Sequence, residues 1–216
     1  MIKAIKASKS EKILFIFLIC LSIFTFSSFF LLKNKCLFIE KNNLTNLNFN
    51  EPNNIAVMDV ECGNVIIELY PDISPKAVER FKILIEKKMY DGSAFYKVSE
   101  NTFVQAGDIE YGNINNLDYS KIGSGKSGLG FLKSELSNDF KFIEGSVGFA
   151  RTAEFDTEDS EFFITLKEIP IYQGEYTPIG KVIYGMDILT KIKTGNKAIY
   201  VLRPDYINTF RMLNSN

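Results

Sequence analysis

Hydrophobic residues divide the chain into one long apolar run and a region of short ones. The long run begins at Ile13, ends at Leu32 and contains no charged residue, proline or glycine. At ~1.5 Å per residue it is long enough to cross a ~30 Å hydrocarbon core, so it predicts one membrane-spanning helix. A cleaved signal peptide is one alternative, but its apolar stretch usually measures about 7 to 15 residues. A lipid-modified cysteine is a second, but Cys20 lies inside the run and Cys36 follows a lysine.

The hydrophobic pattern predicts four segments along the chain. Residues 1–12 form a cytoplasmic N-terminal segment, 13–32 the transmembrane helix, 33–53 a linker and 54–216 a folded domain. Four lysines precede the apolar run and three follow it before residue 42, which favours a cytoplasmic N-terminus under the positive-inside rule. The linker is rich in asparagine and contains Pro52, as expected of a tether. We therefore predict a single-pass membrane protein whose domain lies outside the cytoplasm.

Short apolar runs within residues 54–216 predict a series of β-strands. The runs 55–60 and 64–70 flank a short connection in which Gly63 supplies a positive φ, which predicts a hairpin. Similar runs punctuated by glycine-rich turns predict the remaining strands at residues 94–98, 103–105, 146–150, 162–166, 180–184, 200–202 and 207–212. Many short strands of this kind indicate a barrel or a sandwich.

Two helices are predicted between these strands. The first has a helical repeat of apolar residues, namely Ala77, Val78, Phe81, Leu84 and Ile85. Ser74 is its candidate N-cap, Pro75 suits the first helical position, and lysines near residue 87 suit its C-terminal end. A shorter helix is predicted over residues 187–192. This order of elements is not a regular βαβ repeat, so the fold class is mainly β.

The composition excludes several classes of function. A net charge of -1 leaves no excess of positive charge for binding nucleic acid. The chain has no histidine, which excludes imidazole-based catalytic triads, histidine-ligated zinc and a histidine base. Cys20, Cys36 and Cys62 form no Cys-x-x-Cys pair, so isolated thiols are the favoured interpretation and a Cys36–Cys62 disulfide is the alternative. We expect no metal and no cofactor.

Two further segments have a simple structural interpretation. The glycine-rich run 123–128 lacks the order of a phosphate-binding loop and is interpreted as a surface loop. Asp156, Glu158 and Asp159 are irregularly spaced and have no glycine turn, so we interpret them as a solvated loop and not as a cation site.

Three motifs resemble the cyclophilin family of peptidyl-prolyl cis-trans isomerases, in the order and spacing of that family. Phe-Tyr-Lys-Val at 95–98 and Gln-Ala-Gly-Asp at 105–108 resemble the family's Phe-His-Arg-Val and Gln-Gly-Gly-Asp. The second motif spans Gly145 to Thr152 and continues as Ser-Glu-Phe-Phe-Ile at 160–164. The third spans Tyr176 to Val182 and continues as Gly-Met-Asp at 185–187. The likeness covers roughly residues 55–213.

This resemblance implies a closed eight-stranded antiparallel β-barrel capped by two helices. It also implies that proline-containing polypeptide binds in a groove on the outer face of the barrel. The implied activity is cis-trans isomerisation of X-Pro bonds, in which a catalyst binds the twisted amide better than either planar form. We expect the protein to act as a monomer.

Lys97 and Gln105 are the catalytic candidates that the resemblance implies. Lys97 stands where the family has an arginine that donates a hydrogen bond to the prolyl nitrogen as the amide twists. Lysine is a flexible point charge where arginine is a rigid planar fork, so this difference is expected to weaken catalysis more than binding. Gln105 matches a glutamine whose amide can bind the substrate carbonyl.

The resemblance also implies a set of substrate-binding residues: Phe95, Phe103, Ala150, Arg151, Glu161, Phe163, Tyr172 and Tyr176. Phe163 matches the aromatic wall of the proline pocket, whereas Phe162 is expected to face the barrel interior. The residue after Ala150 supplies a main-chain contact whatever its side chain does. The family's pocket phenylalanine falls on Thr102, so Phe103 is one residue out of phase, and such a slip reverses the facing of a strand residue.

Several groove positions depart from the family pattern. Glu161 replaces a glutamine, Tyr176 replaces a rim histidine, and the rim tryptophan or phenylalanine falls near Ile171 or Tyr172. Glu161 could form an ion pair with Lys97 or compete with substrate for it. Two functions therefore stay open: an isomerase for exported proteins, or a proline-peptide-binding module with little turnover. A surface adhesin ranks below both.

Overall fold

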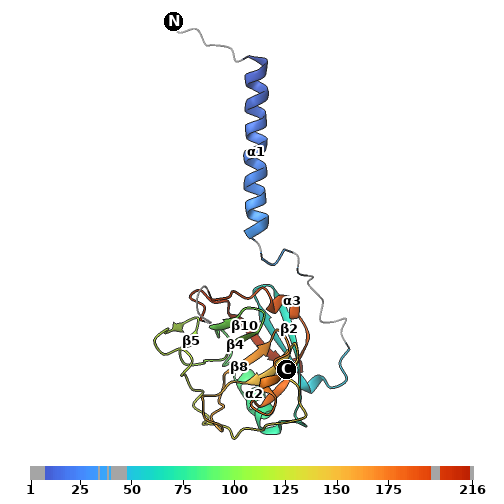
Figure 1. The fold of residues 1–216 in the computed structure, drawn as a ribbon, viewed down its shortest axis with the longest axis vertical. Helices are drawn as coiled ribbons and strands as arrows, with labels where there is room; N and C mark the ends of the chain where they lie inside the picture. The colour runs from blue at the N-terminus through green and yellow to red at the C-terminus, as the bar shows by residue number, and fades with distance from the viewer. Residues whose placement is uncertain (1–7, 34, 38, 40–47, 196–199, 215–216) are drawn as a thin grey trace. The chain divides into compact units, whose positions relative to one another are not determined.

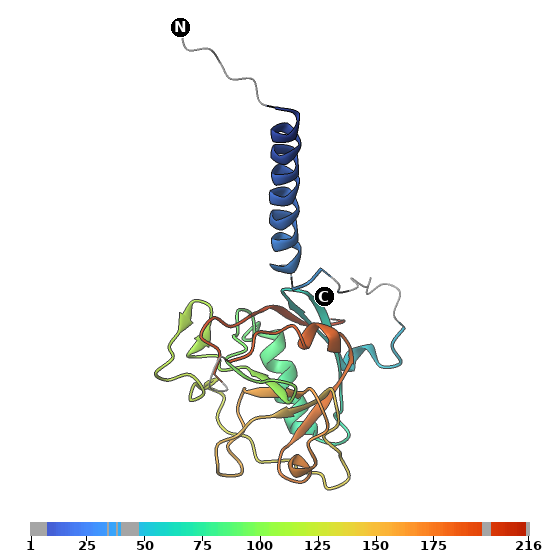
Figure 2. The ribbon, with the colours of Figure 1, turned by 45° about the horizontal axis from the view of Figure 1, so that its top comes forward.

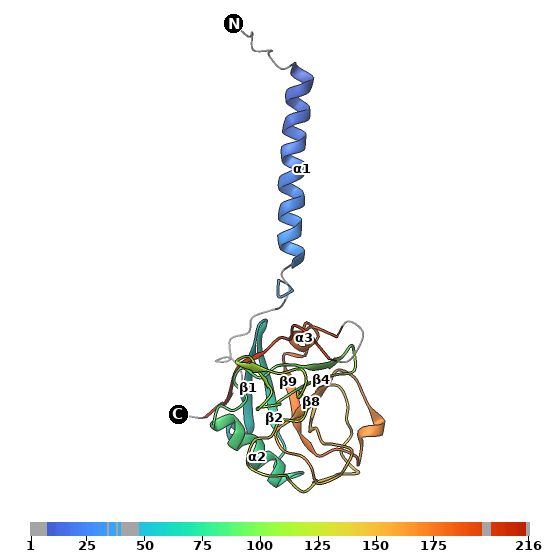
Figure 3. The same cartoon turned by 90° about the vertical axis from the view of Figure 1, so that its left-hand side faces the viewer.

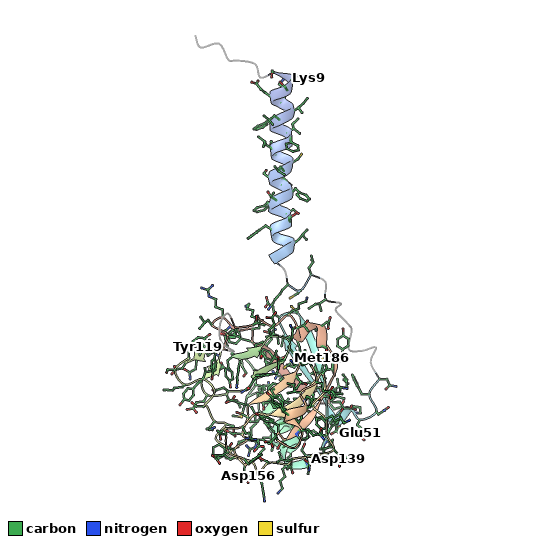
Figure 4. All side chains as sticks on the ribbon, in the orientation of Figure 1. Lys9, Glu51, Tyr119, Asp139, Asp156 and Met186 are labelled. Carbon is green, nitrogen blue, oxygen red and sulfur yellow. The ribbon has the colours of Figure 1, made fainter. Side chains whose placement is uncertain are left out.

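The computed structural model describes residues 8–33, 35–37, 39, 48–195 and 200–214. Its contacts divide the chain into two units, Met1–Phe38 and Ile39–Asn216. The first unit contains α1 (Lys9–Lys33), which includes the predicted helix 13–32 and begins at the labelled Lys9 (Figure 4). Within α1, Lys9–Phe29 is long and apolar enough to cross a membrane. The predicted segments 1–12 and 33–53 lie partly outside the described residues.

The second unit is mainly β, as predicted. Its elements, in chain order, are η2 (Pro52–Asn54), β1 (Ile55–Val60), β2 (Gly63–Leu69), α2 (Pro75–Glu86), β3 (Lys97–Ser99), β4 (Phe103–Ala106), β5 (Gly112–Asn113), β6 (Asn116–Leu117), β7 (Ser146–Phe149), β8 (Phe162–Thr165), η3 (Pro170–Tyr172), β9 (Pro178–Tyr184), α3 (Met186–Leu189) and β10 (Ile207–Met212). The short β5–β6 pair was not predicted. Gly63 has the expected positive φ, at 141°.

Eight strands form one curled antiparallel sheet in the order β10-β1-β2-β9-β7-β8-β4-β3 (Figures 1 and 3). The predicted closed barrel is corrected to a half-barrel, because no ladder joins β3 to β10 among the described residues. Single bridges, Ala94↔Tyr206 and Lys97↔Tyr200, replace the predicted strand at 200–202. The segment between these two bridge positions contains Pro204, which has no N–H to donate to a ladder.

The core lies between α2 and the inner face of the sheet (Figure 2). Phe81 of α2 makes edge-to-face contacts with Phe149, Phe162 and Phe210 at centroid distances of 5.9, 5.2 and 5.6 Å. Such aromatic pairs stabilise a core beyond the apolar area that they bury. Phe162 therefore faces the interior, as predicted, and the five apolar residues predicted for this helix are all buried.

Ser74 occupies the predicted N-cap position of α2, but its side chain does not cap the helix. Its hydroxyl donates a hydrogen bond to the Pro178 carbonyl instead. The carboxylate of Glu135 takes over this role, since it accepts hydrogen bonds from the backbone N–H groups of Lys76 (3.3 Å) and Ala77 (2.8 Å). A carboxylate at a helix N-terminus also complements the helix dipole. The long loop before β7 is thereby attached to α2.

The cysteines differ from one another in redox state. Cys20 is a free thiol, whereas Cys36 and Cys62 are each disulfide-bonded. The interpretation of all three as isolated thiols is therefore wrong for Cys36 and Cys62, because spacing in the sequence does not report which thiols are oxidised.

Candidate active site

Strand register places Lys97, Gln105 and Phe163 in one row across β3, β4 and β8. Lys97 lies opposite Gln105, and Gln105 lies opposite Phe163. Directly opposed residues of antiparallel neighbours project from the same face of a sheet. The alternate residues Val104 and Phe162 are buried in the core, so this row lies on the outer face. The predicted catalytic pair and the predicted aromatic wall are thus neighbours in space.

Phe103 lies on the same face as this row. It precedes Gln105 by two residues in β4, and the ammonium of Lys97 lies 5.8 Å from the centre of its ring. The prediction that the one-residue slip turns Phe103 away from the groove is therefore wrong. Thr102 lies outside the strand and bonds the carbonyl of Glu100 at 3.1 Å. Phe103 thus provides an aromatic surface beside Lys97.

Gln105 is held by two side chains, one of which the sequence did not indicate. Its Nε2 donates to the Tyr96 hydroxyl and to Glu161 Oε2, both at 2.8 Å. The Tyr96 hydroxyl in turn donates to the same Oε2 atom. A glutamine amide has two N–H groups, so a substrate carbonyl can bind this amide only by replacing one of these partners.

Glu161 forms no ion pair with Lys97 among the described residues, contrary to one of the two hypotheses from the sequence. Its partners are Tyr96 and Gln105. Burial raises the pKa of the Glu161 carboxyl above its ordinary value, although the two hydrogen bonds oppose this shift. Burial and the neighbouring Glu161 also raise the pKa of Tyr96, so its hydroxyl stays protonated and acts as a donor.

Phe163 lies under two tyrosines at the end of the row. Its ring is 5.3 Å from that of Tyr172 and 5.2 Å from that of Tyr176, and only 3% of the residue is exposed. A proline ring can stack on Phe163 only when one of these tyrosines moves. Phe95 is corrected as a substrate-binding candidate, because it is fully buried and its backbone N–H bonds the Asp205 carbonyl at 2.9 Å.

The chain after β7 offers an open main-chain edge. Ala150 donates its N–H to the Glu161 carbonyl at 2.8 Å, whereas the Arg151 backbone makes no hydrogen bond within the described residues. The Arg151 side chain is occupied elsewhere. Its Nε and Nη2 atoms bond the carbonyl and the carboxylate of Glu175 at 3.1 and 3.2 Å. Its guanidinium also lies over the ring of Tyr176, 5.0 Å from the centre.

A cavity of about 130 Å³ lies beside Lys97 and Gln105. The residues around it include Tyr96, Lys97, Gln105, Ala150, Arg151, Glu161 and Tyr200. Phe103, Phe163, Tyr172 and Tyr176 do not line it. Most predicted site residues therefore form two groups, the polar cavity and an aromatic cluster of Phe163, Tyr172 and Tyr176, whereas Phe103 lies beside Lys97.

Two buried carboxylates lie next to each other in the chain here, and one of them, Asp159, lines the cavity. Asp159 is 5% exposed and pairs with Arg80 of α2 at 3.1 Å, and it also accepts the backbone N–H of Ser127 at 2.7 Å. Glu158 is 1% exposed and bonds Thr177 at 3.0 Å. The interpretation of these two residues as part of a solvated loop is therefore wrong. Among the described residues no group of three could hold a metal ion.

Comparison with known proteins shows the family. The family model described as cyclophilin type peptidyl-prolyl cis-trans isomerase/CLD matches residues 55–211. The chain belongs to this family. The resemblance inferred from the three motifs is thus confirmed.

Relatives with curated names agree with this assignment. A probable peptidyl-prolyl cis-trans isomerase of Brucella suis is 37% identical over 149 residues, covering 68% of this chain and 76% of the relative. A peptidyl-prolyl cis-trans isomerase of Acinetobacter baylyi is 30% identical over 145 residues, or 65% of this chain and 72% of the relative. These names support isomerase activity in this cyclophilin.

Solved structures confirm the fold. A cyclophilin of Hirschia baltica aligns with a TM-score of 0.63 at 18% identity and covers 74% of both chains. A Cryptosporidium parvum cyclophilin, crystallised in the presence of the dipeptide Ala-Pro, aligns with a TM-score of 0.64 at 23% identity. That alignment covers 75% of this chain and 99% of the other.

Proposed function

We propose that this cyclophilin isomerises X-Pro bonds of proline-containing polypeptides at a membrane, using Lys97 as cationic donor and Gln105 as the amide that binds a substrate carbonyl. The register of Lys97, Gln105 and Phe163 carries this proposal, because it gathers a donor, an amide and an aromatic ring on one face. The Ala-Pro dipeptide of the Cryptosporidium parvum protein supports a proline-containing ligand.

The proposed mechanism needs no covalent step. Rotation about an X-Pro bond crosses a barrier of ~18 to 20 kcal/mol, at which the prolyl nitrogen regains its lone pair. The Lys97 ammonium donates a hydrogen bond to that nitrogen and stabilises the twisted amide more than either planar form. Opposed residues of an antiparallel pair have Cβ atoms about 4.5 to 5.5 Å apart, so Lys97 and Gln105 can reach one X-Pro unit together. The open backbone of Arg151 pairs with the substrate main chain.

The membrane location rests on α1. Its apolar stretch Lys9–Phe29 has the length and hydropathy of a membrane span. The positive-inside bias favours a domain outside the cytoplasm, where it would assist the folding of exported polypeptides. The disulfide-bonded state of Cys36 and Cys62 supports an oxidising compartment.

Substitution of Lys97 tests the catalytic part of this proposal. We expect Lys97→Ala to lower kcat/KM by about 100-fold or more, as removal of one transition-state donor commonly does. Lys97→Arg is expected to raise kcat/KM, because a planar guanidinium is better preorganised. Both are measured in a proline isomerisation assay on the full chain in detergent. Lys167→Ala, at an exposed lysine outside the cavity, is the control for the loss of one positive charge.

A binding module with little turnover is the second candidate, and a specific observation favours it. Tyr172 and Tyr176 cover Phe163, while Gln105 already has two internal partners. Uncatalysed rates in the folded, unmodified protein, together with binding of a proline peptide, would select this candidate over the isomerase.

A further inference from the structure

The two oxygens of the Glu161 carboxylate have different surroundings. Oε2 accepts hydrogen bonds from Tyr96 and Gln105, whereas Oε1 accepts none from the described residues. Every buried side-chain nitrogen or oxygen among those residues has a hydrogen-bond partner. Oε1 is therefore not sealed inside the protein, and Glu161 lines the cavity beside Lys97 and Gln105. The cavity thus contains a carboxylate oxygen that is available to a ligand.

The other charges around this cavity are already matched or lie against aromatic rings. Asp159 is neutralised by Arg80, with Nη1 and Oδ1 3.1 Å apart. The Arg151 guanidinium is paired with a carboxylate outside the cavity lining, at 3.2 Å. The ammonium groups of Lys97 and Lys126 lie 5.8 and 4.9 Å from the centres of phenylalanine rings. Of the two carboxylates that line the cavity, Glu161 is the one that forms no salt bridge among the described residues.

We propose that Glu161 makes this cavity a subsite for a cationic side chain, lysine or arginine, of the polypeptide whose X-Pro bond is isomerised. This inference rests on the proposed function and adds the class of substrate. The cationic group of the substrate donates to Glu161 Oε1, and its aliphatic stem lies along the cavity wall. Tyr200 provides apolar surface for that stem, since it lines the cavity and is 45% exposed, and its ring is held in place by stacking on the buried ring of Tyr96 at 6.1 Å.

The same contact links substrate recognition to the catalytic row. Gln105 donates one of its N–H groups to Oε2 of the carboxylate that receives the cation. A positive charge at Oε1 draws electron density from Oε2 and weakens its bond to Gln105. The Gln105 amide then more readily gives up its hydrogen bond to Oε2 and donates to the substrate carbonyl instead. A cationic side chain is therefore expected to raise kcat as well as lower KM.

Peptides that differ by one charge test the proposal. Lysine and norleucine have similar aliphatic chains, so they are compared at each of the three positions before the X-Pro pair. The full chain in detergent is assayed for isomerisation of each peptide. At one position we expect lysine to raise kcat/KM about tenfold over norleucine, the size of a charge-assisted hydrogen bond.

Two variants assign that preference to Glu161. Glu161→Gln keeps the shape and one acceptor oxygen but removes the charge, so the ratio of lysine to norleucine should fall to about one. Glu154→Gln removes the same charge from an exposed loop outside the cavity and should keep the preference. Circular dichroism of both variants checks that the fold is retained.

The possible results separate this inference from the proposed function. Turnover with equal rates for lysine and norleucine at every position overturns the inference and leaves the function intact. Peptides with glutamate or glutamine at the same positions are assayed as a second pair. A preference for glutamate over glutamine overturns the inference as well, because Lys97 and Lys126 would then select the ligand. If no peptide is turned over, the proposed function fails, and fluorescence anisotropy with the same peptides decides the inference. A lysine preference in binding that Glu161→Gln abolishes supports it, and equal binding overturns it.

Discussion

The loop that forms one wall of the cavity depends on a close approach between Gly125 and Asp108. A Cβ atom at residue 125 would lie 1.9 Å from Asp108 Oδ1, far inside van der Waals contact. Asp108 is fully buried, so its carboxylate has little room to withdraw. We therefore expect Gly125→Ala to displace this carboxylate and release the loop that it holds.

The hydrogen bonds of Asp108 set the size of this effect. Its carboxylate accepts backbone N–H groups from Tyr111 at 2.8 Å, Gly123 at 2.6 Å and Gly125 at 3.2 Å. Hydrogen bonds to charged groups contribute about 1.5 to 3 kcal/mol each, so the loss of two lowers the free energy of unfolding by about 3 to 6 kcal/mol. For a domain of this size, 1 kcal/mol changes Tm by about 2 to 4 °C, so the fall should be at least about 6 °C.

Gly128→Ala is the matched control for this experiment. A Cβ atom there meets no other atom within 4 Å, but the φ of +78° disfavours alanine. This substitution should cost only about 1 to 2 kcal/mol. Thermal unfolding followed by near-ultraviolet circular dichroism, which reports tyrosine packing, compares the two variants. An equal loss of Tm in both would refute the role assigned to the Asp108 carboxylate.

Two further predictions concern pH and topology. Burial raises the pKa of Glu161, with Asp108 adding to the shift and Lys126 opposing it, so the unfolded chain releases this proton at a lower pH than the folded protein. The free energy of unfolding should therefore fall as pH rises from about 4.3 to the raised pKa, and Glu161→Gln should remove that part of the fall in urea titrations. Protease added to intact cells should digest the domain and leave α1 protected. A protected domain would contradict export.

The elements with a strong sequence period were predicted well. The strands β1 and β10 begin and end at the predicted residues, and α2 buries the predicted face. The run 94–98 was predicted less well, because only β3 forms a ladder within it. The backbones of Ala94 and Phe95 bond separate positions in other segments, Gly112 and Asp205. Apolar periodicity does not distinguish such scattered contacts from a continuous strand.

Only those site residues that lie within or beside the three family motifs were predicted from the sequence. Lys97, Gln105 and Phe163 came from the resemblance, and register then showed that they form one row. The bond between Tyr96 and Glu161 joins residues 65 positions apart, and no local pattern carries that information. One signal was available in the first motif, where tyrosine stands in place of the family's histidine. Tyr96 and Glu161 both differ from the family pattern, and two such differences in one site could have suggested that these residues form a pair.

The loops around the site were beyond prediction for a related reason. Arg80 lies on α2, whose five buried apolar residues pack in the core, and its guanidinium bonds the carbonyls of Leu129 and Gly130 at 3.1 and 2.8 Å. Helical periodicity assigns such a residue to a solvated face. The role of Arg80 depends on the loop around Leu129 and Gly130 passing close to α2, and only the assembled fold determines that path.

The pairing of β1 with β10 affects how the domain can be made. These are the first and last strands of the sheet, and Ala56 lies opposite Met212. The sheet can therefore be completed only after the whole domain has been synthesised, and contacts of such long sequence separation form slowly. Until then β1 has only its hairpin partner, and its other edge stays open to foreign strands. A nascent chain in this state is therefore exposed to aggregation through the edge of β1.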